Sequence, residues 1–179
     1  MLVLDVPGSE FFDDEKEEFI ETKPVSLRLE HSLVSISKWE AEWKIPFLST
    51  KALSREQTID YIKFMTINQN VDPLVYSLLD NVHIQKVNEY ISDNRTATTF
   101  TNTNTPPNRQ VVTSELIYFW MAQYNIPFEC QKWHLSRLMT LIRIASIKNA
   151  PEKKMSQRAI MSQNKSLNAA RRKALHTKG

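Results

Sequence analysis

The sequence predicts a mainly α-helical protein, in which a helical domain follows a small N-terminal β element and precedes a basic C-terminal helix. Three observations support this fold class. Only two glycines, Gly8 and Gly179, occur in 179 residues, although barrels and sandwiches with many tight turns need more. Apolar residues recur at helical spacing from Ser32 onward. β-forming residues alternate or cluster only before that point.

The N-terminal element spans residues 1–31. Short strands are expected at 2–8 and 24–31, because the β-forming residues there end at Pro-Gly or at a polar residue. The stretch between them, SEFFDDEKEEFIET, is expected to form either a helical turn opened by Ser9 or an acidic loop.

Residues 32–92 make up the predicted helical region. A capping box of Ser54 and Gln57 predicts one helix over 55–68, and Asp72-Pro73 opens two short helices that fill 73–92. Before them, an earlier helix ends at Pro46 and has an apolar face made by Leu33, Ile36, Trp39 and Trp43.

Residues 93–110 are expected to be a polar linker or long loop, because they are rich in Thr and Asn and lack apolar area to offset their ordering entropy. A two-helix unit follows over 111–150. Thr113 or Ser114 caps its first helix, which Pro127 ends, and a longer antiparallel helix is expected over about 128–148.

Residues 151–179 are predicted to form a basic C-terminal helix or tail, with Ser156 as a candidate cap. Its apolar positions are sparse and its basic residues are dense. Such a helix is marginal alone in water, so we expect it to need a partner.

Charge is distributed unevenly along the chain. Residues 1–30 hold nine acidic and three basic residues, whereas residues 131–179 hold one acidic and twelve basic residues. Opposite charge at the two ends allows pairing within one chain, homo-oligomers joined through the acidic N-terminus and the basic C-terminus, or binding of the basic end to an acidic partner. The sequence leaves these three alternatives open.

Catalysis and cofactor binding are not expected. The two glycines lie near opposite ends of the sequence. Phosphate-binding loops and dinucleotide fingerprints need closely spaced glycines, so both are excluded. Cys130 and His134 would share a face of the predicted helix, as a ligand pair or a nucleophile and base require, but a structural zinc site needs about four ligands. Both side chains, with Trp133, are therefore expected to pack. The prediction is no enzyme, no metal and no cofactor.

Three further features have simple structural interpretations. The acidic run 13–18 lacks the glycine that calcium loops use for their turn, so we interpret it as a solvated face. No apolar run of about 18 residues indicates a membrane span. The four tryptophans are spaced for packing in a core or an interface rather than for base stacking.

Four segments carry a resemblance to a known family: SLRLEHSLVSISKWEAEWKIPFL, ELIYFWMAQYNIPFECQKWHLSRLMTLIRI, KNAPEKKMS and LNAARRKALHTKG. They resemble a family of similar length found in the tail modules of bacteriophages and prophages, whose members are usually called tail assembly chaperones. The resemblance covers the chain from about residue 10 to its end and is weakest over 93–110.

The resemblance implies a function that composition and spacing do not show. Tail assembly chaperones are thought to bind the long helical tape-measure protein, keep it from aggregating and present it to tail-tube subunits. The expected location is the host cytoplasm during virus assembly. One alternative is a virion structural subunit, such as a neck, tail-terminator or capsid-associated protein. Another is a nucleic-acid-binding protein that uses its basic C-terminal tail.

Partner-binding residues are expected on apolar helix faces and at the basic end. A tape-measure or other phage tail protein is the expected partner, and no membrane is expected to be one. The candidate residues are Trp120, Trp133, Arg137, Arg143, Arg158, Arg171, Arg172 and Lys173.

Overall fold

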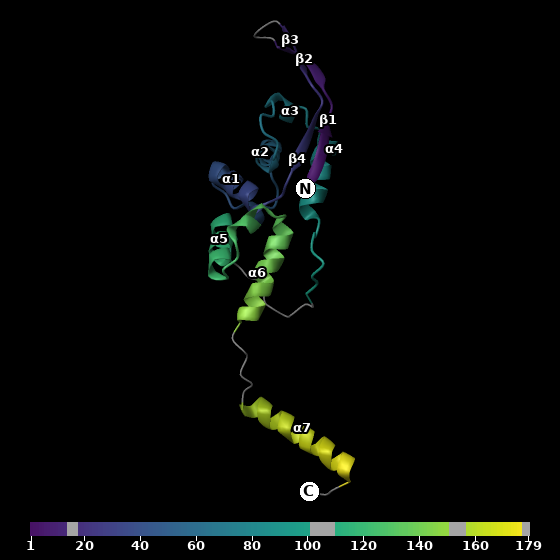
Figure 1. Cartoon of the computed structure of the whole chain (residues 1–179), viewed down its shortest axis with the longest axis vertical. Helices are drawn as coiled ribbons and strands as arrows, with labels where there is room; N and C mark the ends of the chain where they lie inside the picture. The colour runs from purple at the N-terminus through teal and green to yellow at the C-terminus, as the bar shows by residue number, and fades with distance from the viewer. Residues whose placement is uncertain (14–17, 101–109, 151–156, 177–179) are drawn as a thin grey trace. The chain divides into compact units, whose positions relative to one another are not determined.

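A computed structural model of the chain describes residues 1–13, 18–100, 110–150 and 157–176. The predicted fold class is confirmed: the chain is mainly helical, with a small N-terminal β element (Figure 1). Within the described residues the α-helices are α1 Leu33–Trp43, α2 Arg55–Met65, α3 Leu74–Ser77, α4 Asn81–Ser92, α5 Ser114–Gln123, α6 Leu135–Asn149 and α7 Gln157–Leu175.

Both strands predicted near the N-terminus are present. β1 (Leu2–Val6) pairs antiparallel with β4 (Val25–Leu29), and Leu2 lies opposite Leu29. Alternate residues of each strand are buried, as expected for a ribbon with one face on the core. The residues directly after α2 hydrogen-bond to β4: the Ile67 N–H donates to the Arg28 carbonyl at 2.8 Å.

The interpretation of the stretch between these strands as a helical turn or acidic loop is wrong. It holds a second antiparallel pair, β2 (Ser9–Asp13) and β3 (Glu18–Thr22), which continues beyond β1 and β4 (Figure 1). Phe and Ile favour strands, but the dense carboxylates obscured this preference. Residues 14–17 between the strands lie outside the described residues.

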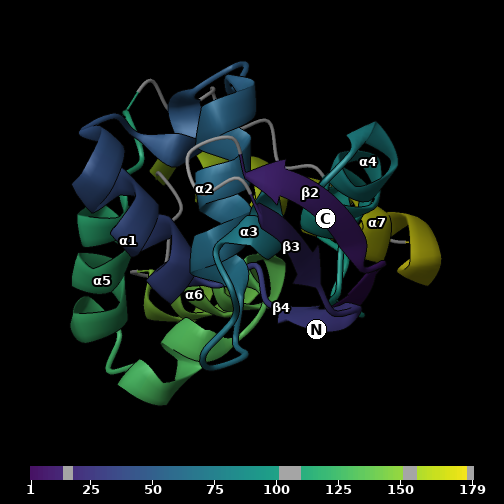
Figure 2. The same cartoon turned by 90° about the horizontal axis from the view of Figure 1, so that it is seen from above.

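The core forms where α1 and α2 pack together beneath the β1–β4 ribbon. Ile36 and Trp39 of α1 and Ile62 of α2 are fully buried. The Trp39 indole N–H donates to the backbone carbonyl of Gln57 at 2.9 Å, which satisfies the one polar atom of this large side chain. Figure 2 shows α1 lying alongside α5 on one side of α2.

A buried carboxylate fixes where α5 begins. Glu40 on α1 is 8% exposed and accepts two backbone N–H groups, from Phe47 at 2.8 Å and from Ser114 at 2.7 Å. Ser114 is the first residue of α5, whose N-terminal N–H groups have no partner within the helix. The Glu40 carboxylate therefore attaches α5 to α1, while Thr113 caps α5 as predicted.

Other predicted helix starts are also present. Ser54 and Gln57 form a reciprocal capping box at α2. Asp72 Oδ1 accepts from the Leu74 N–H at 2.9 Å at the start of α3. The two short helices expected over 73–92 are α3 and α4, and Asp80 caps the second of them.

The continuous helix predicted over about 128–148 is wrong. Residues Phe128–Lys132 form a 3-10 helix, η2, and α6 begins only at Leu135. Between them His134 makes a β-bridge with Ser32, and the Leu135 N–H donates to the His31 carbonyl at 2.8 Å. This pairing with the chain ahead of α1 replaces helical hydrogen bonds. The first helix of the pair also ends at Gln123, four residues before Pro127.

The chain divides into two compact units, Met1–Ser146 and Ile147–Gly179. In the segment predicted as a linker, residues 93–100 and 110 have no helix or strand, and 101–109 lie outside the described residues. The second unit contains α7, the predicted basic helix. Residues 151–156, with the candidate cap Ser156, lie outside the described residues.

Candidate functional site

The candidate partner-binding residues fall into three groups. Trp120 and Arg143 line one hollow, and Trp133 and Arg137 line another. The remaining candidates, Arg158, Arg171, Arg172 and Lys173, lie on α7 and are exposed. The first two groups belong to the unit Met1–Ser146.

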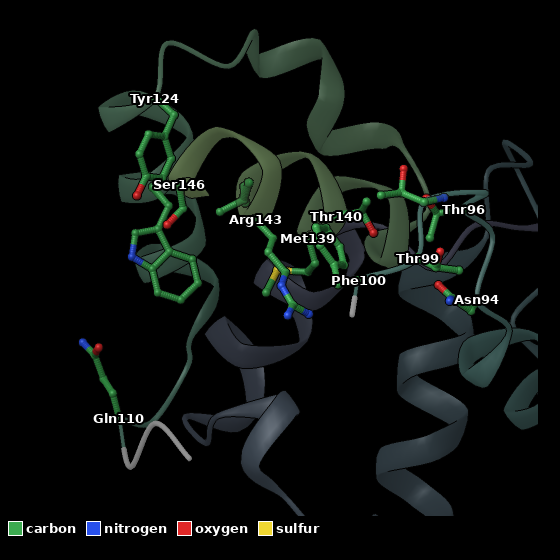
Figure 3. Close-up of a pocket in the computed structure, with 13 residues that line it drawn as sticks. Asn94, Thr96, Thr99, Phe100, Gln110, Tyr124, Met139, Thr140, Arg143 and Ser146 are labelled. Atoms are coloured by element: carbon green, nitrogen blue, oxygen red, sulfur yellow. The ribbon is translucent and has the colours of Figure 1, made fainter. Parts of the chain in front are cut away.

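The first hollow, called here the α5–α6 hollow, has a volume of about 830 Å³. Its apolar wall comes from Trp120 of α5, from Tyr124 directly after that helix, and from Met139 and Ile142 of α6. Asn94, Thr96, Thr98 and Thr99 form its polar rim. In Figure 3, Tyr124 and Ser146 lie at one end and Thr96 and Thr99 at the other. An apolar hollow with a polar rim is the usual form of a protein's ligand or partner site.

Arg143 lies in the middle of the α5–α6 hollow. Its guanidinium carbon is 4.0 Å from the centroid of the Phe100 ring, within the range of a cation–π contact. Figure 3 shows this pair beside Met139. The contact holds the end of the 94–100 segment against α6, and the Arg95 N–H, which donates to Ser136 Oγ at 3.2 Å, holds its beginning.

The second hollow, called here the basic hollow, has a volume of about 640 Å³. Its basic lining residues are Arg95, Lys132 and Arg137, and Trp133 lines it as well. The Arg137 guanidinium carbon lies 4.9 Å from the Trp133 ring centroid, and Trp133 is 38% exposed. Trp133 therefore packs with Arg137 at the surface rather than in the core, which corrects the expectation that it is buried.

Helix α7 presents the third group. Every residue of α7 with a described exposure is exposed, including Ile160 and Leu167. The helix carries five basic residues and no acidic residue. Arg158, Lys165 and Arg172 recur every seven residues and so share one face, opposite to the face of Ile160 and Leu167.

Cys130 and His134 pack as predicted, but they do not share a helical face. Cys130 is 5% exposed and lies in η2, whereas His134 is 4% exposed and lies in the extended residues before α6. His134 Nδ1 accepts from the Ser136 N–H at 3.3 Å, which leaves Nε2 to donate to the Tyr90 carbonyl at 3.2 Å. Both ring nitrogens are therefore occupied in positioning α4 against the start of α6.

His31 lies beside His134 in the same buried cluster. The ring centroids are 5.2 Å apart, and His31 Nδ1 lies 2.5 Å from the Tyr61 hydroxyl. Burial, and then the neighbouring His134, lower the pKa of His31 to about 3. Burial also lowers the pKa of His134. Both imidazoles are neutral at pH 7 and act as fixed hydrogen-bonding groups.

Sequence reasoning missed two contributors to the basic hollow, Arg95 and Lys132. Arg95 sits in the segment interpreted as a linker, and its guanidinium carbon lies 4.6 Å from the Tyr90 ring centroid. Lys132 ends η2, within the range predicted as one continuous helix over about 128–148. The sequence signal that could have pointed to this hollow is the pair Lys132-Trp133, in which a basic residue stands next to an aromatic residue.

The described residues contain no group of three or more His, Cys, Asp or Glu side chains arranged to hold a metal ion. In the same part of the chain no helix is both long and apolar enough to cross a membrane. Comparison of the chain with protein-family models, with curated proteins and with solved structures finds no match.

Proposed function

We propose that this protein is a bacteriophage tail assembly chaperone, which binds the tape-measure protein without covalent chemistry in the host cytoplasm. The observation that carries the proposal is the α5–α6 hollow, in which apolar side chains of α5 and α6 lie beside polar side chains and which the described part of the protein leaves open. The resemblance of residues 115–144, which contribute both helices of the hollow, supports the identity of the client.

The lining of the hollow suits an adaptable contact with a helix. Met139 has an unbranched, polarisable side chain that fills irregular gaps, and Trp120 and Tyr124 offer large rigid faces. An amphipathic client helix would place side chains at positions i, i+3, i+4 and i+7 in such a groove. Each apolar client side chain that becomes fully buried contributes about 1.5–3 kcal/mol.

Several weak contacts of this kind would mask a long client and still release it. A tape-measure protein exposes apolar stripes along its length until tail-tube subunits cover them. A chaperone with a shallow groove covers one stretch at a time, and many copies cover the whole client. The subunits that replace the chaperone need only bind each stretch more tightly.

Co-expression with the tape-measure protein encoded nearby tests the proposal. We expect the client to be soluble with this chain and insoluble without it. Trp120→Ala should abolish the rescue, and Phe119→Ala, on the adjacent residue of α5 that is 60% exposed and outside the hollow, should leave it intact. Equal client solubility with and without the chain would reject the proposal.

A second variant separates loss of binding from loss of folding. Ser146 is exposed and lines the hollow, so Ser146→Trp should fill the groove without removing any core side chain. We expect it to prevent rescue while the urea unfolding midpoint stays at the wild-type value. Rescue by this variant would place the client elsewhere.

The exposed basic helix α7 favours nucleic-acid binding as a second candidate function, since five cations without an acid would release counterions from a phosphate backbone. Truncation after Ala150 should then abolish retention on a polyanion column at moderate salt. A virion structural subunit, the other alternative, would be detected by mass spectrometry of purified particles.

A further inference from the structure

The basic hollow has an excess of positive charge that the described residues do not neutralise. Two carboxylates reach it, and both are engaged. Glu30 is paired with the Met1 amine at 2.9 Å and accepts from the Tyr90 hydroxyl at 2.6 Å, while Asp93 is paired with Arg95 at 2.9 Å. Among the described residues, no carboxylate lies within ion-pair distance of Lys132 or Arg137.

The side chains of this hollow are of the types that make protein contacts. Lys132, Trp133 and Arg137 are exposed, and Trp133 and Arg137 are held together by their cation–π contact. Trp and Arg are enriched at the energetically important positions of protein interfaces. A cation whose plane is already fixed against an aromatic ring loses less entropy when it binds a carboxylate.

The β2–β3 ribbon, called here the acidic arm, has the opposite charge. Between Ser9 and Thr22 the sequence contains seven acidic residues and one basic residue. Glu10 and Glu21 are exposed and lie directly opposite each other in the register of the ribbon. Like charges at such a position destabilise a strand pair, and an isolated two-stranded ribbon is marginal in water. A cationic partner would relieve both problems.

The acidic arm leads away from the basic hollow of its own chain. Met1 lines the hollow, and β1 runs from Leu2 to Val6 before the arm begins at Ser9. Figure 1 shows β2 and β3 beyond the end of β1 that is farther from the N-terminus. Because β1 is paired with β4 along its whole length, the arm reaches its own hollow only if that pairing is lost.

We propose that the acidic arm of one copy of this protein docks in the basic hollow of a second copy. Glu10 and Glu21 of the arm pair with Lys132 and Arg137, and the Trp133 ring covers part of the contact. Two copies can exchange their arms reciprocally in an isologous dimer, or successive copies can bind head to tail in a heterologous ring or filament. This inference does not depend on the identity of the client.

Analytical ultracentrifugation of the full chain, with a mass of 20.9 kDa, tests self-association. At about 50 mM salt we expect species heavier than the monomer, and at about 500 mM salt we expect dissociation, because exposed charges are screened over short distances there. Lys132→Glu with Arg137→Glu, and separately Glu10→Lys with Glu21→Lys, should each weaken self-association by at least about tenfold.

Mixing the two charge-reversed proteins is the decisive experiment. Each alone should be monomeric, but together they should associate, since the reversed arm of one now faces the reversed hollow of the other. Arg172→Glu with Lys173→Glu on α7 is the matched control and should self-associate like the wild type. Circular dichroism and urea midpoints equal to wild type establish that each variant is folded.

Three results would overturn the proposal. A monomeric wild type at low salt removes it. Self-association that survives reversal of the hollow shows that the arm, or another surface, binds elsewhere. Failure of the mixture to associate, with both variants folded, means that the two surfaces do not meet, and the hollow then belongs to an acidic segment of another protein.

Discussion

Helices α6 and α7 both carry basic side chains, but only α6 is part of a core. α6 buries Leu135, Leu138 and Ile142, whereas every residue of α7 with a described exposure is exposed. The difference arises from spacing. In α6 the large apolar residues lie three and four apart, whereas in α7 Ile160, Leu167 and Leu175 lie seven and eight apart, with Met161 next to Ile160. With so few large apolar residues, α7 offers too little apolar surface to join a core, and its stripe is better suited to contact with a partner.

The largest expected effect tests the buried side of this comparison. Leu138 on α6 is fully buried, so Leu138→Ala should lower the free energy of unfolding by about 2–5 kcal/mol through lost apolar contact and a residual cavity. Leu167→Ala on α7, where the side chain is 47% exposed, is the matched control and should change it by less than about 0.5 kcal/mol. Urea unfolding monitored by tryptophan fluorescence measures both.

Similar losses from the two leucines would contradict the comparison. They would mean that α7 is packed as tightly as α6 under the conditions of the measurement. The same experiment at several protein concentrations separates packing within one chain from packing between copies.

A second prediction concerns the carboxylate that attaches α5. Glu40→Ala would leave the Phe47 and Ser114 N–H groups buried without an acceptor, at a cost of about 2–4 kcal/mol in unfolding free energy. Glu42→Ala, two residues away on the exposed side of α1, should cost less than about 0.5 kcal/mol. Equal midpoints for the two variants in urea would show that Glu40 does not hold α5.

Sequence reasoning located the helices that have local start signals and failed where distant chain segments decide the structure. Ser54 with Gln57, and Thr113, are caps that can be read from neighbouring residues. The break between η2 and α6 depends on His31 and Ser32, about a hundred residues earlier. No local pattern encodes that pairing, so the region was predicted as one helix.

The same distinction applies to the candidate site. Residue type and helical spacing were enough to select Trp120 and Arg143, which do line one hollow. They could not show that Arg137 contacts Trp133, or that Arg95 from a supposed linker lies at the same hollow. Glu40 was unremarkable in sequence because an acid on an amphipathic helix is ordinarily solvated. Its burial depends on the position of α5, which is set by tertiary packing and cannot be read from the local sequence.

A third prediction concerns the buried histidines His31 and His134, because α7 contains no residue of this kind. The folded-state pKa of His31 is about 3, below the value of about 6.5 in an unfolded chain, so the unfolded state takes up a proton first as pH falls. Stability is therefore complete above about pH 6.5 and is lost as pH falls toward 3, by about 2 kcal/mol at pH 5 from this histidine alone. Burial of His134 acts in the same direction.

Urea midpoints between pH 7.5 and 5 measure this slope. His31→Asn keeps a hydrogen-bonding side chain toward Tyr61 but does not titrate in this range, so its slope should be shallower than that of the wild type. Carboxylates titrate mainly below this range and leave the comparison intact. An unchanged slope in the variant would show that His31 is not protonated on unfolding.

The smallest expected effect is that of removing α7, and it is the most direct test of the difference between α6 and α7. Truncation after Ala150 removes α7, whose residues with a described exposure contribute nothing buried, so the thermal midpoint should shift by less than about 2 °C. A shift that small would show that the first unit folds without the apolar stripe of Ile160 and Leu167, so that the stripe is available to a partner. Scanning calorimetry of the full and truncated chains measures the shift. A drop of more than about 4 °C would mean that α7 stabilises the rest of the chain, and its exposed stripe would then have its partner within this protein.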